Sequence, residues 1–142
     1  MNEKKLSEQE LAASIQLLQE QGKILASNVE VLTIYLQELT TSKVTLEGIM
    51  QLKKGDEILV PIGGSSFIKA RIDDTEKVIV GIGANVSVDR TAEEASRNVE
   101  ERINLIQSRI KENEEKYVSV AGKLEELSAE ARELLDKKGE NV

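Results

Sequence analysis

In the first third of the chain, leucine recurs every seven residues, at Leu11, Leu18, Leu25, Leu32, Leu39 and Leu46. Most of the intermediate positions carry Ile15, Val29, Leu36 and Met50. A repeat of about 3.5 residues keeps a narrow apolar stripe against another helix, whereas a helix on a globular core needs a broader face. The pattern therefore predicts a helix from about Ser7 to Lys54, ended by Lys53, Lys54 and Gly55, that packs on a second long helix.

A second heptad run fills the last third of the chain. Thr91 and Glu94 have the spacing of a capping box, which predicts the helix start. The positions expected in its seam are Val99, Ile103, Ile106, Ile110, Asn113, Tyr117, Val120, Leu124, Leu127, Ala131 and Leu134. A helix of roughly 45 residues extends about 65 to 70 Å, so each helix is far longer than a domain of this size is wide.

Between the helices, the apolar period changes from seven residues to two. Ile68, Ala70 and Ile72 alternate with Lys69 and Arg71, and β-branched residues dominate, which predicts four short strands. A shift of twenty residues superimposes Ile58, Val60, Ile62, Gly63 and Ile68 on Val78, Val80, Ile82, Gly83 and Val88. The segment is thus a weak repeat of one β-hairpin.

The loops of the two hairpins are expected at residues 63–66 and 83–85, where glycine and asparagine tolerate positive φ. The polar residues 73–76 would join the hairpins. The chain is therefore divided into a first helix (1–54), two hairpins (55–90) and a second helix (91–142). The predicted fold class is α+β.

Two helices joined by a compact unit return antiparallel, with both termini at one tip. The register in which paired residue numbers sum to 142 joins Leu18 with Leu124, Leu25 with Tyr117, Leu32 with Ile110, and Leu39 with Ile103. It also places Gly22 beside Val120, and a register one heptad away stays open. Lys43 and Asn113 interrupt the seam, and such polar residues can fix a register.

The strand sequences ILVPI and VIVGI are apolar on both faces. Four strands are too few to close a barrel, which takes about eight, and uncovered strand edges recruit partners. We therefore predict assembly with other subunits through the strands, and we expect Pro61, which lacks an N–H, at an edge or a bulge. The predicted interface residues are Ile58, Val60, Ile62, Phe67, Val78, Val80 and Ile82.

Composition narrows the possible chemistry. One Phe, two Tyr, no Trp and 32% charged residues argue against a thick globular core. The lack of Cys and His excludes thiol and imidazole catalysis, disulfides and the common zinc sites. The glycines of residues 81–83 lack the third glycine of a dinucleotide loop, and the acidic residues 73–76 lack the spacing of a calcium loop. We expect no enzyme, no cofactor and no metal.

The net charge of −7 disfavours nucleic acid and anionic membranes, so protein partners are expected. The N-terminal sequence MNEKKLSEQE has no apolar signal region, and no apolar run reaches membrane-spanning length. These features predict a cytoplasmic protein.

Two long helices that flank ILVPIGGSSFIKARI and VIVGIGANVSVDR resemble prefoldin, specifically its alpha-class subunits of archaeal type. Two hairpins match the alpha class, whereas the beta class has one. The resemblance implies a hexamer of two alpha and four beta subunits with a double β-barrel body made by the strands. It also implies six coiled-coil arms whose tips capture unfolded proteins, without nucleotide, for transfer to a group II chaperonin.

For such an ATP-independent chaperone, the expected client contacts are Leu6, Leu11, Ile15, Leu17, Leu127, Leu134 and Leu135. Seam burial should be weakest at this tip, because helix termini fray. Ile24 and Val31 follow Leu17 at heptad spacing outside the seam, as further candidates for client or inter-arm contact. The alternative is a structural coiled-coil tether that docks one folded partner, which would not protect unrelated unfolded proteins from aggregation.

Overall fold

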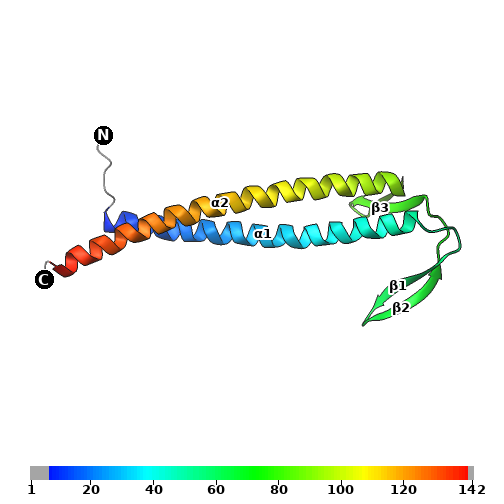
Figure 1. Cartoon of the computed structure of the whole chain (residues 1–142), viewed down its shortest axis with the longest axis horizontal. Helices are drawn as coiled ribbons and strands as arrows, with labels where there is room; N and C mark the ends of the chain where they lie inside the picture. The colour runs from blue at the N-terminus through cyan, green and yellow to red at the C-terminus, as the bar shows by residue number, and fades with distance from the viewer. Residues whose placement is uncertain (1–6, 141–142) are drawn as a thin grey trace. The chain divides into compact units, whose positions relative to one another are not determined.

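The computed structural model describes residues 7–140 of the chain. In order, its elements are α1 (Glu8–Met50), β1 (Glu57–Gly63), β2 (Ser66–Arg71), β3 (Lys77–Gly83), β4 (Val86–Thr91) and α2 (Ala92–Glu140) (Figure 1). The prediction of two long helices around two β-hairpins is confirmed. The residues form two compact units. The terminal unit holds α1 up to Ile34 and α2 from Gln107, and the hairpin unit holds Tyr35–Ile106.

The start of α1 is fixed by a reciprocal capping box that was not predicted from the sequence. The Glu10 N–H donates to Ser7 Oγ at 3.2 Å, and the Ser7 N–H donates to Glu10 Oε2 at 3.3 Å. The sequence Ser-Glu-Gln-Glu carries the S-x-x-E signal for this motif, so the rule applied at Thr91 would have found it. At the start of α2, the Glu94 N–H donates to Thr91 Oγ1 at 3.1 Å, as predicted.

The end of α1 lies at Met50, earlier than the predicted Lys54. The N–H groups of Gln51 and Leu52 bond to carbonyls three residues back, at 3.2 and 3.0 Å, which tightens the last turn. Ile49, three residues after Leu46 on the same face of the helix, is half-buried, whereas Met50, the last residue of α1, is 41% exposed. The prediction that Met50 belongs to the seam is therefore wrong.

The heptad positions of both helices are otherwise the protected ones. On α2, every predicted seam residue is buried or half-buried except Tyr117, which is 45% exposed. The fully buried apolar residues of the described chain are Leu11, Leu39, Leu46, Ala92, Ala95 and Ile106. Since the protected positions follow a 3.5-residue period on both helices, the helices pack as a coiled coil.

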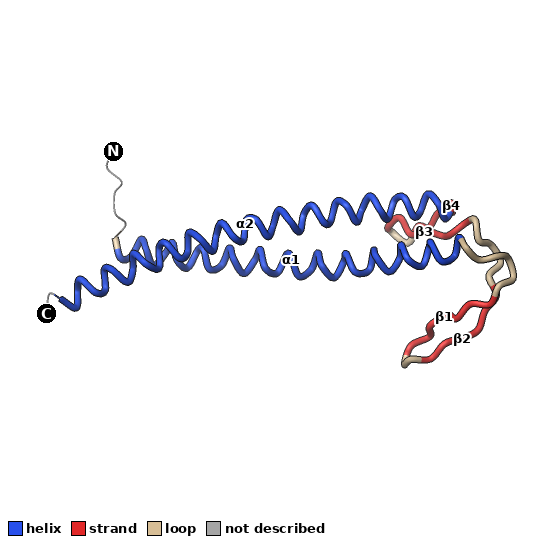
Figure 2. The backbone as a smooth tube through the Cα atoms, viewed as in Figure 1, coloured by secondary structure: helices blue, strands red, loops and turns tan. Residues whose placement is uncertain are grey.

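In the terminal unit, α1 and α2 run side by side in opposite directions (Figures 1 and 2). A Cβ atom added to Gly22 would lie 3.9 Å from Val120 Cγ1 and 3.8 Å from Tyr117 Cε2. The prediction that Gly22 lies beside Val120 is thus confirmed. In the hairpin unit, Lys43 Nζ lies 3.7 Å from Glu100 Oε1, so the seam lysine is accommodated by a carboxylate beside the seam.

The two hairpins have the same internal register, offset by twenty residues. β1 pairs with β2 from Glu57↔Arg71 to Gly63↔Ser66, and β3 pairs with β4 from Lys77↔Thr91 to Gly83↔Val86. Both registers shift before the loop, between Pro61 and Gly63 and between Gly81 and Gly83, so the expected irregularity at Pro61 is confirmed. Figure 2 shows two separate pairs of strands rather than one sheet.

Both hairpin loops turn through residues with positive φ. Gly64 and Ser65 have φ of 57° and 62°, and Ala84 and Asn85 have φ of 50° and 61°. Positive φ at both central residues defines a type I′ turn, whose twist matches that of the paired antiparallel strands. The repeat therefore extends to the loop conformation, although Ala84 stands where the first loop has a glycine.

β3 and β4 lie against the helices of the hairpin unit. Val78 and Val80 share a groove with Leu39, Leu46 and other residues of both helices, and Val88 of β4 is half-buried. Within residues 7–140, neither helix contains a stretch apolar and long enough to cross a membrane.

Candidate functional site

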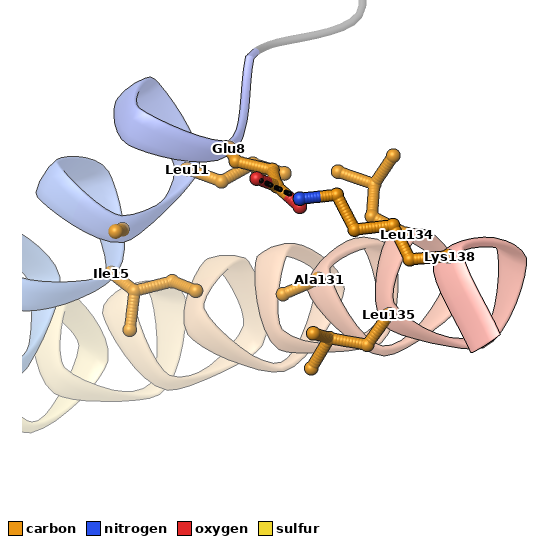
Figure 3. Close-up of a pocket in the computed structure, with 8 residues that line it drawn as sticks. Glu8, Leu11, Ile15, Ala131, Leu134, Leu135 and Lys138 are labelled. Atoms are coloured by element: carbon orange, nitrogen blue, oxygen red, sulfur yellow. Dashed lines mark hydrogen bonds and ion pairs between the residues drawn. The ribbon is translucent and has the colours of Figure 1, made fainter. Parts of the chain in front are cut away.

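At the ends of the two helices, the terminal unit forms a cleft of about 380 Å³ (Figure 3). Its lining is apolar apart from Glu8 and Lys138, and the other lining residues are Leu11, Ala12, Ile15, Ala131, Leu134 and Leu135. Lys138 Nζ lies 2.6 Å from Glu8 Oε2, so an ion pair joins the first turn of α1 to the last turn of α2. Neither partner of this ion pair was predicted from the sequence.

The prediction that seam burial is weakest at this end is wrong for Leu11. Leu11 is only 2% exposed, as low as any buried residue of the described chain. The capping box of Ser7 begins the helix just before this leucine, and the Leu11 N–H bonds to the Ser7 carbonyl at 2.9 Å. Because the last turns of α2 continue past this level, Leu11 lies against packed neighbours instead of a frayed end.

The other expected client contacts differ in accessibility. Ile15, Leu127 and Leu134 are half-buried, whereas Leu135 is 66% exposed and Leu17 is 57% exposed. Leu6 lies outside the described residues. Leu135 is therefore the large apolar residue of the cleft with the most surface to offer an incoming apolar chain (Figure 3).

A second group of accessible apolar side chains lies on the hairpins. Of the predicted interface residues, Val60, Ile62, Phe67 and Ile82 are exposed, whereas Ile58, Val78 and Val80 are half-buried. Four further apolar residues of the hairpins are exposed as well, although they were not among the predicted interface residues: Leu59, Ile68, Ile79 and Val86. Ile79 is 77% exposed, and the runs ILVPI and VIVGI, which are apolar on both faces, were a signal that could have identified Leu59 and Ile79 as interface residues.

These hairpin residues cover both faces of two-stranded ribbons. Ile79 points to the face opposite Val78 and Val80, because successive side chains of a strand alternate between faces. A two-stranded hairpin is only marginally stable alone and gains stability when its apolar face is covered. The arrangement suits burial against further strands.

The segment between the hairpins is held by one carboxylate. Asp74 Oδ1 accepts the N–H of Glu76 at 2.8 Å and the N–H of Lys77 at 3.1 Å. These hydrogen bonds hold the pKa of Asp74 below its ordinary value, because they stabilise the ionised carboxylate. Within residues 7–140, the carboxylates form no group of three or more that could hold a metal ion.

Comparison with protein families gives a match over most of the chain. The family described as "Prefoldin subunit" matches residues 18–137. Prefoldin subunit alpha 1 of Thermococcus kodakarensis is 42% identical over 95 residues, which are 67% of this chain and 65% of that protein. Prefoldin subunit alpha of Pyrococcus horikoshii is 34% identical over 130 residues, which are 91% of this chain and 88% of that protein.

Two solved structures are similar in fold. The cryo-EM structure of filamentous PFD from Methanocaldococcus jannaschii gives a TM-score of 0.69 at 25% identity, covering 84% of this chain and 98% of that chain. The crystal structure of the prefoldin beta subunit from Thermococcus strain KS-1 gives a TM-score of 0.58 at 18% identity, covering 95% and 97%. The second likeness concerns the fold alone.

Proposed function

The chain belongs to the prefoldin family of molecular chaperones, and on that premise we propose that it is an alpha-class subunit of an ATP-independent holdase. Its hairpins assemble with beta-class subunits, two alpha with four beta, in the cytoplasm. The tips of its arms capture unfolded proteins and pass them to a group II chaperonin. The observation that carries the proposal is the presence of accessible apolar side chains at two places, the tip cleft and the hairpins.

The support for assembly comes from the hairpin surface. Leu59, Ile62, Phe67, Ile79 and Ile82 each expose more than half of their surface in the single chain. Burial of apolar area is worth about 25 cal/mol per Å², so five such side chains supply a strong drive to associate. Exposed apolar surface gathered in one segment is typical of an interface between proteins.

The assembly test uses Ile82→Asp. Ile82 is exposed in the single chain, so the substitution leaves the fold intact but places an unpaired charge in the interface, which costs several kcal/mol. Native mass spectrometry after mixing with a beta-class subunit should show a hexamer for the natural chain and none for the variant. Val118→Asp, at a residue 70% exposed on α2, is the control and should assemble. A hexamer formed by the Ile82 variant would refute assembly through this strand.

The support for client capture comes from the tip cleft. Its apolar residues lie at the end of the coil, and Leu135 is accessible there (Figure 3). A contact of 200 to 300 Å² contributes only roughly 5 to 8 kcal/mol before the cost of association, which is weak for one arm. Several arms on one body raise the effective concentration and strengthen binding by about 10² to 10⁴. Weak, multiple contacts allow capture and release without nucleotide.

The client test replaces the two exposed residues among the expected client contacts, Leu135 in the tip cleft and Leu17 outside it, in the assembled complex. Leu135→Ser with Leu17→Ser should reduce the suppression of aggregation of an unrelated unfolded protein while leaving the hexamer mass unchanged. Val118→Ser is the control, because it removes a similarly exposed apolar side chain of the same unit that is not among the expected client contacts. Full protection by the double variant would exclude these leucines as the client site. The tether alternative predicts no protection even by the natural complex.

A further inference from the structure

The terminal unit carries a row of basic side chains that have no acidic partner on the opposite helix. The row consists of Arg109, Lys116 and Lys123, spaced by seven residues beside the α2 seam. In coiled coils, such flanking positions ordinarily form ion pairs between helices. The corresponding flank of α1 carries Gln21 and Asn28, which are uncharged. We call these three residues the cationic row.

Within residues 7–140, no ion pair joins a residue of the cationic row to α1. Lys116 Nζ lies 3.2 Å from Glu112 Oε1 of its own helix, and both side chains are more than half exposed. No ion pair of the described residues involves Arg109 or Lys123. An exposed pair within one helix contributes little, so an incoming carboxylate can compete for Lys116.

An apolar row lies on α1, and its middle residue, Ile24, shares a groove with Lys116, the middle residue of the cationic row. Leu17, Ile24 and Val31 are 57%, 61% and 63% exposed, and they too are spaced by seven residues. The two rows meet in a groove of about 360 Å³ lined by Gln21, Ile24 and Leu25 of α1 and Lys116, Ser119 and Val120 of α2. Because the helices are antiparallel, Leu17 follows Ile24 in the same direction along the coil as Lys123 follows Lys116, each by one heptad.

We propose that this groove binds an acidic amphipathic helix of a client, with apolar residues at heptad spacing on the apolar row and Asp or Glu beside the cationic row. Apolar and charged residues that both repeat every seven positions match a third helix laid along the coil. The inference rests on the proposed function, since it names a class of client segment. The whole chain has a net charge of −7 and repels acidic segments in general, so attraction depends on this local row.

The test measures the binding of three labelled helical peptides to the full-length chain by fluorescence anisotropy. One peptide has leucines at heptad spacing with glutamates on one flank, the second has lysines in place of the glutamates, and the third has serines in place of the leucines. The acidic peptide should bind about tenfold tighter than the lysine peptide, because three exposed ion pairs are gained. The serine peptide should bind more weakly than the acidic one, and added salt should reduce the difference.

A triple variant and a matched control locate the effect. The variant is Arg109→Gln, Lys116→Gln and Lys123→Gln, and it should remove the preference for the acidic peptide. The control is Lys23→Gln, Lys111→Gln and Arg132→Gln, which makes the same change in charge at three residues of the same unit that belong neither to the cationic row nor to the groove lining. The control should keep the preference. Since all six positions lie on exposed helix faces, circular dichroism should show unchanged helix content.

Charge reversal supplies a second readout. Lys116→Glu should weaken binding of the acidic peptide and strengthen binding of the lysine peptide. Equal affinities of the natural chain for the two peptides would overturn the proposal. An undiminished preference in the triple variant, binding of a labelled oligonucleotide as tight as that of the acidic peptide, or a signal caused only by self-association of the chain would also overturn it.

The outcome separates this inference from the proposed function. A complex that suppresses aggregation but shows no charge preference among the peptides retains the holdase function and loses the acidic-helix site. A chain that binds the acidic peptide through the cationic row but never suppresses aggregation retains the site and loses the holdase function.

Discussion

Gly22 occupies a position of the α1 seam where coiled coils ordinarily have a larger side chain. A Cβ atom added there would lie 3.8 Å from Tyr117 Cε2 and 3.9 Å from Val120 Cγ1, which is ordinary van der Waals contact. Gly22→Ala should therefore fill the seam without moving its neighbours. Replacing a glycine inside a helix by alanine is worth about 1 kcal/mol, and a half-buried methyl group adds about 0.4 kcal/mol. We expect a gain in stability of about 1.5 kcal/mol.

The measurement is thermal unfolding of the assembled protein, followed by circular dichroism. For a chain of this size, a gain of about 1.5 kcal/mol corresponds to a rise in Tm of roughly 5 °C. Gly122→Ala is the matched control, because a Cβ atom there meets no atom within 4 Å. This variant should be stabilised only by the higher helix propensity of alanine. The difference between the two variants isolates the contact across the seam.

Two results would refute this reasoning. A lower Tm for Gly22→Ala would mean that the helices approach too closely at this level for a methyl group. An equal rise for both variants would mean that Gly22 makes no contact across the seam, and the register that joins it to Val120 would then be wrong.

Three further predictions concern the loops and the helix start. Ala84→Gly should stabilise the second hairpin by about 1 kcal/mol and Gly64→Ala should destabilise the first by a similar amount, since both positions have positive φ. Hydrogen exchange of the strand amides measures both effects, and a destabilising Ala84→Gly or a stabilising Gly64→Ala would contradict the turn assignment. Ser7→Ala should cost about 1 kcal/mol at the start of α1 and speed exchange of the Leu11 amide, and unchanged exchange would show that the cap is dispensable. The pKa of Asp74, measured by NMR, should lie below 3.8, because the hydrogen bonds to its carboxylate favour the ionised form. These bonds stabilise the folded loop at pH above the unfolded pKa, and this stabilisation is lost as pH falls through the folded pKa. A pKa of 3.8 or above would contradict the hydrogen bonds to the carboxylate.

Several features of this protein follow from its sequence alone, because they depend on local backbone geometry. A seven-residue apolar repeat requires a helix with a narrow buried stripe, and alternation with a period of two requires strands. The twenty-residue repeat, from Ile58 and Val78 onward, reproduces the whole register of each hairpin and its irregularity before the loop. Family membership is consistent with the residues that carried the resemblance, since they lie within the matched range 18–137.

Other features were decided by which distant segments meet. Leu11 is buried because a helix cap precedes it and the last turns of α2 lie against it, while sequence position alone suggested a frayed end. At the end of α1, Ile49 is half-buried and Met50 is exposed, because the helix stops at Met50 and no further turn covers that side chain. Val60 and Val80 are equivalent in the repeat, yet Val60 is exposed and Val80 half-buried, because the second hairpin lies against helices. Periodicity fixes which face of an element is apolar, but the burial of that face depends on the tertiary neighbours that cover it.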